Sequence, residues 1–184
     1  MSWLETRTVA RLAAVALLAA LTAGCFQPMY AERGPSGDAA LRDKLSTVEF
    51  PPLNVPNGSR EARLGVAIRN ELMFKSYGGG AGAPPLYKLA MRLQTSRVTV
   101  ITDSTTARPE TESYGIDATY ELREIATDKV VMNGSTSAHV TNDIPGQEQR
   151  FARDRGLRDA EDRAAKVIAE NISTRLASYF YAGM

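Results

Sequence analysis

Apolar and polar residues alternate along three consecutive segments in the middle of the chain, with the two-residue period of strands that bury one face. The first segment follows Pro84-Pro85, and its two faces carry Leu89, Met91 and Leu93 on one side and Lys88, Arg92 and Gln94 on the other. Beyond Ser96 the apolar residues are Val98 and Val100, so the parity of the pattern changes. We therefore predict a β-bulge near Ser96–Arg97 that restores the register.

The next two segments continue this alternation. In the second segment, five apolar residues share one face: Tyr114, Ile116, Ala118, Tyr120 and Leu122. Four polar residues share the other face: Asp117, Thr119, Glu121 and Arg123. The third runs from Val130 to Val140. Turns are predicted at Arg108-Pro109 and at Thr127-Asp128-Lys129. Three strands joined by short loops predict an antiparallel meander with one wet face.

Two other segments have the 3.6-residue period of amphipathic helices. One follows the N-cap signal Asn57-Gly58-Ser59 and ends before residues 78–82, a glycine-rich run that lacks the Gly-Lys-Ser/Thr of a phosphate loop. The other runs from about Arg153 to Tyr179, after a loop from Asn142 to Gly146. The predicted buried residues are Leu64, Ala67, Ile68 and Leu72 in the first helix, and Leu157, Ala160, Ala164, Val167, Ile168, Ile172, Leu176 and Phe180 in the second. The predicted i,i+4 ion pairs of the second helix are Arg155/Asp159, Asp159/Arg163 and Asp162/Lys166.

A short alternating segment, Leu45–Phe50, predicts one more strand ahead of the first helix, and Pro51-Pro52 ends it. The predicted order is therefore β-α-β-β-β-α. This order is that of an α+β two-layer sandwich, in which two helices cover one face of a four-stranded, mostly antiparallel sheet. We expect a single domain over residues 45–184.

The first 24 residues are typical of a secretory signal rather than of a folded element. Two arginines precede an apolar stretch of about a dozen residues, which is too short to span a membrane. The stretch ends at Leu21-Thr22-Ala23-Gly24, directly before the only cysteine, Cys25. This resembles a bacterial lipobox, and it predicts that Cys25 is the lipidated first residue of the mature chain. An ordinary cleaved signal is the alternative. Residues 26–44 are rich in Gly, Pro and polar residues, and we expect them to be a flexible tether.

Charge and residue chemistry narrow the function classes. Removing two arginines and one glutamate with the signal leaves 20 basic and 20 acidic residues, so no charge excess favours nucleic acid. His139 is the only histidine and lies on a polar strand face, where we expect it to be solvated. Glu110 and Glu112 fall on a predicted solvated loop. Neither a catalytic constellation nor a metal-ligand pattern is recognisable, and we expect neither catalysis nor a cofactor.

The remaining features suit an interaction protein. The polar sheet face favours either cross-strand charge pairing in solvent or contact with a partner protein or an anionic lipid headgroup. Its basic candidates are Lys88, Arg92 and Arg97. The aromatic run Tyr179-Phe180-Tyr181 is expected to pack the end of the last helix against the sheet, with a partner or membrane contact as the alternative.

The start of the predicted mature chain, Cys25-Phe26-Gln27-Pro28-Met29-Tyr30, resembles that of the LptE family of LPS-assembly lipoproteins, commonly Cys-Gly-Phe-x-Pro-Leu-Tyr. The first strand, the Leu64 and Ile68–Leu72 run of the short helix and the Asp159-Ala160 helix fit the same family. This chain departs from the family by lacking the Gly after Cys25 and by carrying Met29 where Leu is common.

This resemblance implies a function without catalysis. Such proteins insert into the lumen of a large outer-membrane β-barrel, LptD, help it assemble, and assist delivery of lipopolysaccharide to the outer leaflet. The expected location is therefore the outer membrane of a Gram-negative bacterium, reached through the lipid anchor, and Phe26 in place of an inner-membrane retention Asp agrees with it. The alternative is an auxiliary lipoprotein of another envelope machine, serving phospholipid transport or peptidoglycan-synthase activation.

Overall fold

The computed structural model describes residues 40–78, 80, 82–144 and 150–182. The predicted signal, Cys25 and most of the predicted tether lie outside these residues. In chain order the elements are α2 (Leu41–Ser46), β1 (Val48–Glu49), α3 (Arg60–Tyr77), β2 (Tyr87–Thr102), β3 (Pro109–Glu124), β4 (Val130–Asp143) and α4 (Arg150–Ala182). The residues from Arg42 onward form one compact unit.

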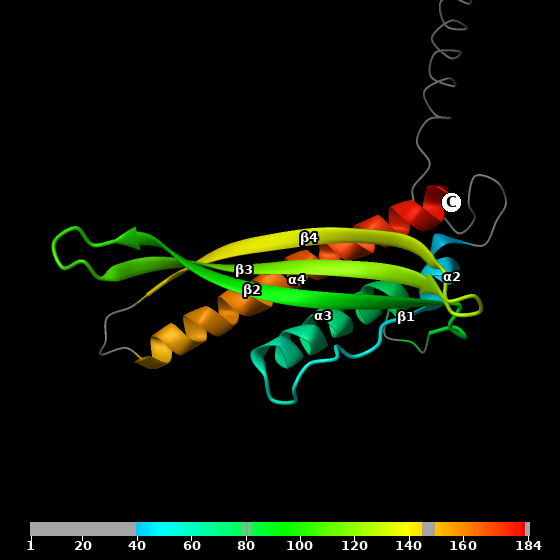
Figure 1. The fold of residues 1–184 in the computed structure, drawn as a ribbon, viewed down its shortest axis with the longest axis horizontal. Coiled ribbons are helices and arrows are strands. Elements are labelled where there is room, and N and C mark those ends of the chain that lie inside the picture. Colours follow the sequence, from blue (N-terminus) through cyan, green and yellow to red (C-terminus); the bar gives the residue numbers. More distant parts are fainter. Residues whose placement is uncertain (1–39, 79, 81, 145–149, 183–184) are drawn as a thin grey trace, which may run out of the picture. The chain divides into compact units, whose positions relative to one another are not determined.

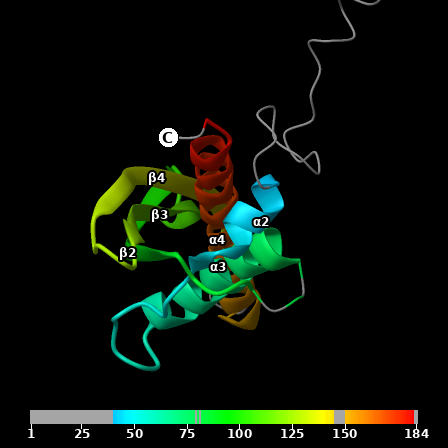
Figure 2. The same ribbon diagram turned by 90° about the vertical axis from the view of Figure 1, so that its right-hand side faces the viewer.

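The four strands form one sheet in the order β1-β2-β3-β4. The two-residue β1 runs parallel to β2, while β2, β3 and β4 form an antiparallel meander. Both long helices, α3 and α4, lie on the same side of this sheet (Figures 1 and 2). The predicted α+β fold, with a mostly antiparallel four-stranded sheet and helices on one face, is confirmed.

Strand β3 confirms the buried and exposed faces that its alternating sequence predicts. The five apolar residues predicted to share one face are all buried, at most 4% exposed, and the polar residues between them are exposed or half-buried. Helix α4 packs on β3 and β4 and covers that face. In a strand that is covered on one side only, the pairing register is strongly specified, because a one-residue shift would expose all of its apolar side chains.

Helix α3 begins and ends at local signals. The Ser59 hydroxyl accepts a hydrogen bond from the Ala62 N–H at 3.1 Å and caps the first turn, as the sequence predicts. Gly78 ends the helix at φ 70°, and its N–H donates to the Phe74 carbonyl at 2.8 Å. Two of the remaining residues in the glycine-rich run, Gly79 and Ala81, lie outside the described residues.

Several predicted boundaries are wrong. The first strand is only Val48–Glu49, because the chain from Leu41 to Ser46 is helical, with the Ser46 hydroxyl donating to the Asp43 carbonyl at 2.7 Å. Asn142 was expected in a loop but lies in β4, paired with Glu112. Of that predicted loop, residues 145 and 146 lie outside the described residues.

The predicted bulge at Ser96–Arg97 is also wrong. The β2–β3 register is continuous there, with Ser96 opposite Gly115, and it shifts only around Ile101. Val98 is therefore on the polar face, where it is 61% exposed, and Val100, at the register shift itself, is 56% exposed. Figure 1 shows that the distal part of the β2–β3 hairpin extends past α3, so neither face needs to be apolar there.

Helix α4 differs from its predicted buried face at Val167 and, to a lesser degree, at Leu157, which is half-buried. Val167 was expected to be buried but is 42% exposed, whereas Ala165 and Ala169 are buried. The helix packs against both the sheet and α3, which widens and rotates its buried arc. Buried alanines at this arc let the helix axis approach its neighbours closely.

Candidate interaction surface

The face of β2, β3 and β4 turned away from the helices is called here the outer sheet face. Cross-strand pairing places Arg92, Thr119 and Ser135 in one row, and Gln94, Asp117 and Ser137 in the next. All six of these residues are exposed. The predicted grouping of polar residues on this face is confirmed, and so is the outward position of His139.

Some basic residues of the outer sheet face form ion pairs with acidic residues, and others do not. The Arg123 guanidinium lies 2.8 Å from Glu121 and 3.5 Å from Asp128, and the Glu121 hydrogen bond is the main reason why the Arg123 pKa lies above its ordinary value. Lys88 stands directly opposite Arg123, which is an unfavourable like-charge pairing. Within the part of the chain that the structure describes, neither Lys88 nor Arg92 has an acidic partner within 4 Å. Both cations therefore remain available to an external anion.

Arg97, the third basic candidate, does not share this surface. With the register continuous, its odd position places it on the opposite face, where its guanidinium lies 5.9 Å from the centre of the Tyr114 ring. The sequence pattern predicted Arg97 and Arg92 on one face only because a bulge was expected between them. The structure therefore leaves Lys88 and Arg92 as the basic pair of the outer sheet face.

A groove of about 810 Å³ crosses this face. The segment 51–55, which follows β1, forms one wall. The other lining residues include Lys88, Arg92, Thr119 and Glu121 of the outer sheet face, and Met91 and Leu93 of the opposite face. Both unpaired cations thus line the same depression. A groove with two cations and several hydroxyl groups can bind a phosphate or a polar protein surface.

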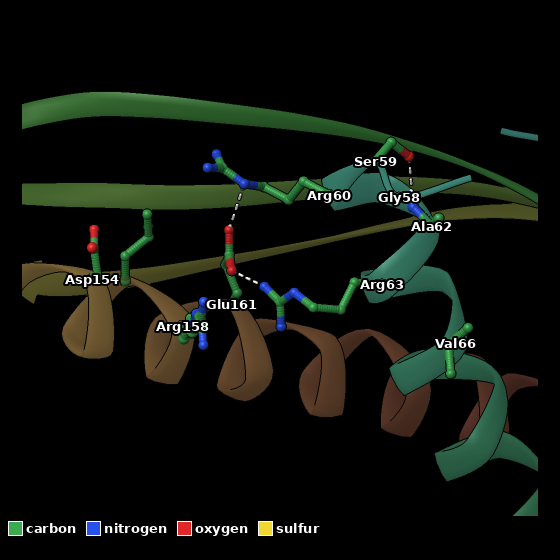
Figure 3. Close-up of a pocket in the computed structure, with 10 residues that line it drawn as sticks. Gly58, Ser59, Arg60, Ala62, Arg63, Val66, Asp154, Arg158 and Glu161 are labelled. Carbon is green, nitrogen blue, oxygen red and sulfur yellow. Dashed lines mark hydrogen bonds and ion pairs between the residues drawn. The ribbon is translucent and has the colours of Figure 1, made fainter. Parts of the chain in front are cut away.

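A second pocket of about 760 Å³ lies between the first turn of α3 and the N-terminal half of α4 (Figure 3). Its buried Glu161 bridges two arginines of α3: Arg60 Nε lies 3.0 Å from Glu161 Oε1, and the Arg63 guanidinium contacts Oε2. Arg63 also lies 3.2 Å from Asp162. These contacts join the two helices, and the carboxylates neutralise the arginines, so the pocket is better explained as packing than as a binding site.

These contacts correct the predicted ion pairs of the last helix. Asp159 and Arg163 do pair, at 2.7 Å. Asp162 pairs with Arg63 of α3 instead of Lys166, and Arg155 has no acidic partner within 4 Å among the described residues. Sequence reasoning missed Glu161 altogether, since its partners come from another helix about a hundred residues away.

Other candidate residues also have structural explanations. Glu112, expected on a solvated loop, is buried in β3 and accepts a hydrogen bond from Asn142 at 3.1 Å. Phe180 is buried and packs edge-on against Tyr87, as predicted for the aromatic run, while Tyr181 is 43% exposed. In the described ranges no group of three or more His, Cys, Asp or Glu residues could hold a metal, and none of the helices there is long and apolar enough to cross a membrane.

Comparison with known proteins gives one family and several similar folds. The family model LptE, described as lipopolysaccharide-assembly, matches residues 45–176. A solved structure of a protein from Caulobacter crescentus CB15 is 22% identical, with a TM-score of 0.59, and the match covers 78% of this chain and 97% of that one. The rare lipoprotein B from Shewanella oneidensis is 11% identical, with a TM-score of 0.49 over 72% of this chain and 92% of its own. No protein with a curated description matches the chain.

Proposed function

Because the chain belongs to the LptE family of lipopolysaccharide-assembly proteins, we propose that it is a lipoprotein of the outer membrane that plugs the lipopolysaccharide-translocating β-barrel LptD. It assists the assembly of this barrel and the delivery of lipopolysaccharide to the surface of a Gram-negative bacterium. In the mature chain, Cys25 carries the lipid after residues 1–24 are removed. The protein acts by binding, with no bond made or broken, as expected of a non-enzymatic accessory family.

The family match carries this proposal, and the outer sheet face supports it. Strands of 16, 16 and 14 residues extend roughly 50 Å at about 3.3 Å per residue, and three strands are roughly 14 Å wide. The face thus offers on the order of 700 Å². A standard protein–protein interface buries about 800 Å² on each partner. The outer sheet face can therefore supply most of a stable interface, and its hydroxyl and amide groups suit the polar wall of a barrel lumen.

Two cations without acidic partners in the described part of the chain support the proposed contact with lipopolysaccharide. Phosphate groups bind Lys and Arg through charge-assisted hydrogen bonds. Lys88 and Arg92 line one groove. Among the described residues neither has an acidic partner within 4 Å, so a phosphate can bind them without breaking an ion pair. We assign the lipopolysaccharide contact to this pair and withdraw Arg97, which lies on the other face.

Affinity purification of the tagged, lipidated protein from detergent-solubilised outer membranes tests the proposed partner. Mass spectrometry of the co-purifying proteins should identify a large β-barrel at about one copy per copy of this chain. Recovery of a peptidoglycan synthase or a phospholipid transporter, without any barrel, would show that the protein serves another envelope machine.

A binding titration with purified lipopolysaccharide tests the proposed contact. Lys88→Ala with Arg92→Ala should lower the affinity by roughly fivefold for each cation, since a solvent-exposed ionic contact contributes about 1 kcal/mol. Arg97→Ala is the matched control for Arg92→Ala, because it removes one positive charge from the opposite face of the same strand. Equal losses in the double variant and in the control would refute the assignment.

A further inference from the structure

Exposed apolar and aromatic side chains gather at one end of the compact unit. Leu86, Ile125, Val130 and Tyr181 are 58%, 46%, 37% and 43% exposed. Isolated exposed apolar residues are common on protein surfaces, so only their grouping is informative. These four come from three separate parts of the fold: the start of β2, the β3–β4 turn and the end of α4.

Hydrogen bonds and ring contacts bring these parts together. The Ile125 N–H donates to the Leu86 carbonyl at 2.9 Å, which places the β3–β4 turn beside the start of β2. The Phe180 ring lies 5.3 Å from the Tyr87 ring and 5.3 Å from the Tyr179 ring. The last turn of α4 therefore packs on the same corner. We call Leu86, Ile125, Val130 and Tyr181 the tether-end surface, for the reason that follows.

The chain enters the compact unit at this same end. The Lys44 ammonium donates to the Phe180 carbonyl at 3.4 Å, and the Thr47 carbonyl accepts the Leu86 N–H at 2.9 Å. Figures 1 and 2 both show α2 beside the end of α4, and Figure 1 shows the tip of the β2–β3 hairpin at the opposite end. Only fifteen residues, 26–40, separate this entry point from Cys25. Fifteen residues span at most about 54 Å.

The composition of the tether-end surface fits a bilayer interface. Branched aliphatic side chains bury well among acyl chains, and tyrosine favours the headgroup level, where its ring is apolar and its hydroxyl is wet. Lys44 and Lys129 border the surface, but so do Glu124 and Asp128. With both signs present, apolar burial rather than net charge must provide the attraction. A short tether raises the local concentration of lipid, so even a weak contact is occupied.

We propose that the tether-end surface rests on the lipid bilayer that holds the acylated Cys25. This inference goes beyond the proposed function and rests on one part of it, the lipidation of Cys25. Other exposed apolar residues lie elsewhere, among them Val98 and Val100 on the β2–β3 hairpin and Phe151 at the start of α4, the far end of that helix from Tyr181. The lipid contact would fix which end of the unit meets the bilayer, because the tip of the β2–β3 hairpin lies at the opposite end (Figure 1).

The only tryptophan of the full sequence, Trp3, lies in the predicted signal, so the mature chain has none and each introduced tryptophan reports alone. Leu86→Trp and Tyr181→Trp each place a single fluorophore on the tether-end surface. Val98→Trp on the hairpin and Phe151→Trp at the start of α4 are matched controls at exposed apolar positions elsewhere. Each lipidated variant is reconstituted in phosphatidylethanolamine–phosphatidylglycerol vesicles with brominated acyl chains, after its lipid is confirmed by mass spectrometry and its fold by circular dichroism.

The proposal predicts a blue shift and strong quenching of the tryptophan fluorescence in the Leu86→Trp and Tyr181→Trp variants, at low and high salt alike, with neither change in the two controls. Quenching absent from both test variants, or equal in all four, would overturn it. So would shielding of the test positions only after the purified β-barrel is added, because the surface would then bind protein. The first measurement uses vesicles without lipopolysaccharide or barrel, and the barrel is added only in a second step, so a negative result in the first leaves the proposed function intact.

Discussion

Removing both arginines that bind Glu161 should cost much more stability than the two single substitutions added together. Glu161 is 2% exposed in α4, and the two cations reach it from the first turn of α3 (Figure 3). The Arg60 and Arg63 side chains are 44% and 43% exposed. The anion is thus buried while both cations can be rehydrated.

The expected magnitudes follow from this asymmetry. After Arg60→Ala or Arg63→Ala the buried carboxylate keeps one cation, and a half-exposed ion pair contributes about 1 kcal/mol. After both substitutions the carboxylate is buried without a cation, which costs about 3–5 kcal/mol. The double variant should therefore lose about 1–3 kcal/mol more than the two single losses together.

Urea unfolding of the mature chain with Cys25→Ser, followed by far-UV circular dichroism, measures these free energies. Lys75→Ala is the control on the same helix, because Lys75 makes only a partly exposed i,i+4 contact of 3.8 Å with Glu71 and should change stability by no more than about 0.5 kcal/mol. Additivity of the Arg60 and Arg63 losses within about 0.5 kcal/mol would refute the reasoning.

Three further predictions concern the core and the sheet. Burial raises the pKa of Tyr114. The Tyr114 hydroxyl has no hydrogen-bond partner among the described residues. Because the folded state favours the neutral phenol, Tyr114 contributes its full stability below about pH 10, and this stability is lost as the pH rises toward the folded pKa. Tyr114→Phe should therefore unfold less steeply in alkaline titrations and should not be destabilised at pH 7; a loss above about 2 kcal/mol would reveal a missed hydrogen bond. Gly134→Ala places a Cβ 2.7 Å from a buried tyrosine hydroxyl and should cost about 1–3 kcal/mol in urea unfolding, whereas Gly115→Ala meets exposed serine and histidine side chains that can rotate and should cost less. The reverse order would contradict the packing. On α4, Ile168→Ala should cost about 2–5 kcal/mol and the adjacent Val167→Ala less than about 1, and similar losses would show that the buried arc is misplaced.

The predictable parts of the fold are those that depend only on residues close together in the sequence. The alternation in β3 and the Ser59 cap of α3 need no knowledge of the remaining fold, since each depends on residues within a few positions. The same alternation placed Lys88 and Arg92 on one face. It could do so because β2 and β3 pair without interruption from Tyr87 to Thr99.

The parts that were not predictable depend on where other elements end. Val98 and Val100 suggested a shifted register, but they are exposed because the hairpin extends past α3, and no property of β2 alone reveals this. That error moved Arg97 to the wrong face. Likewise, Asp162 had a suitable partner one helical turn away, yet an arginine of α3 lies closer. Local charge spacing cannot rank a neighbour against a residue that only tertiary packing brings near.

Site-specific photo-crosslinking in living cells tests the central claim most directly. A photoreactive residue is placed at Thr119 or Ser135 on the outer sheet face, and at Glu170 on the exposed side of α4 as the control. The account predicts that Thr119 and Ser135 form adducts with one large outer-membrane β-barrel and that Glu170 forms far fewer. Barrel adducts at Glu170 but not on the sheet would show that the helices dock instead. Adducts with a different envelope protein at all three positions would contradict the proposed function itself.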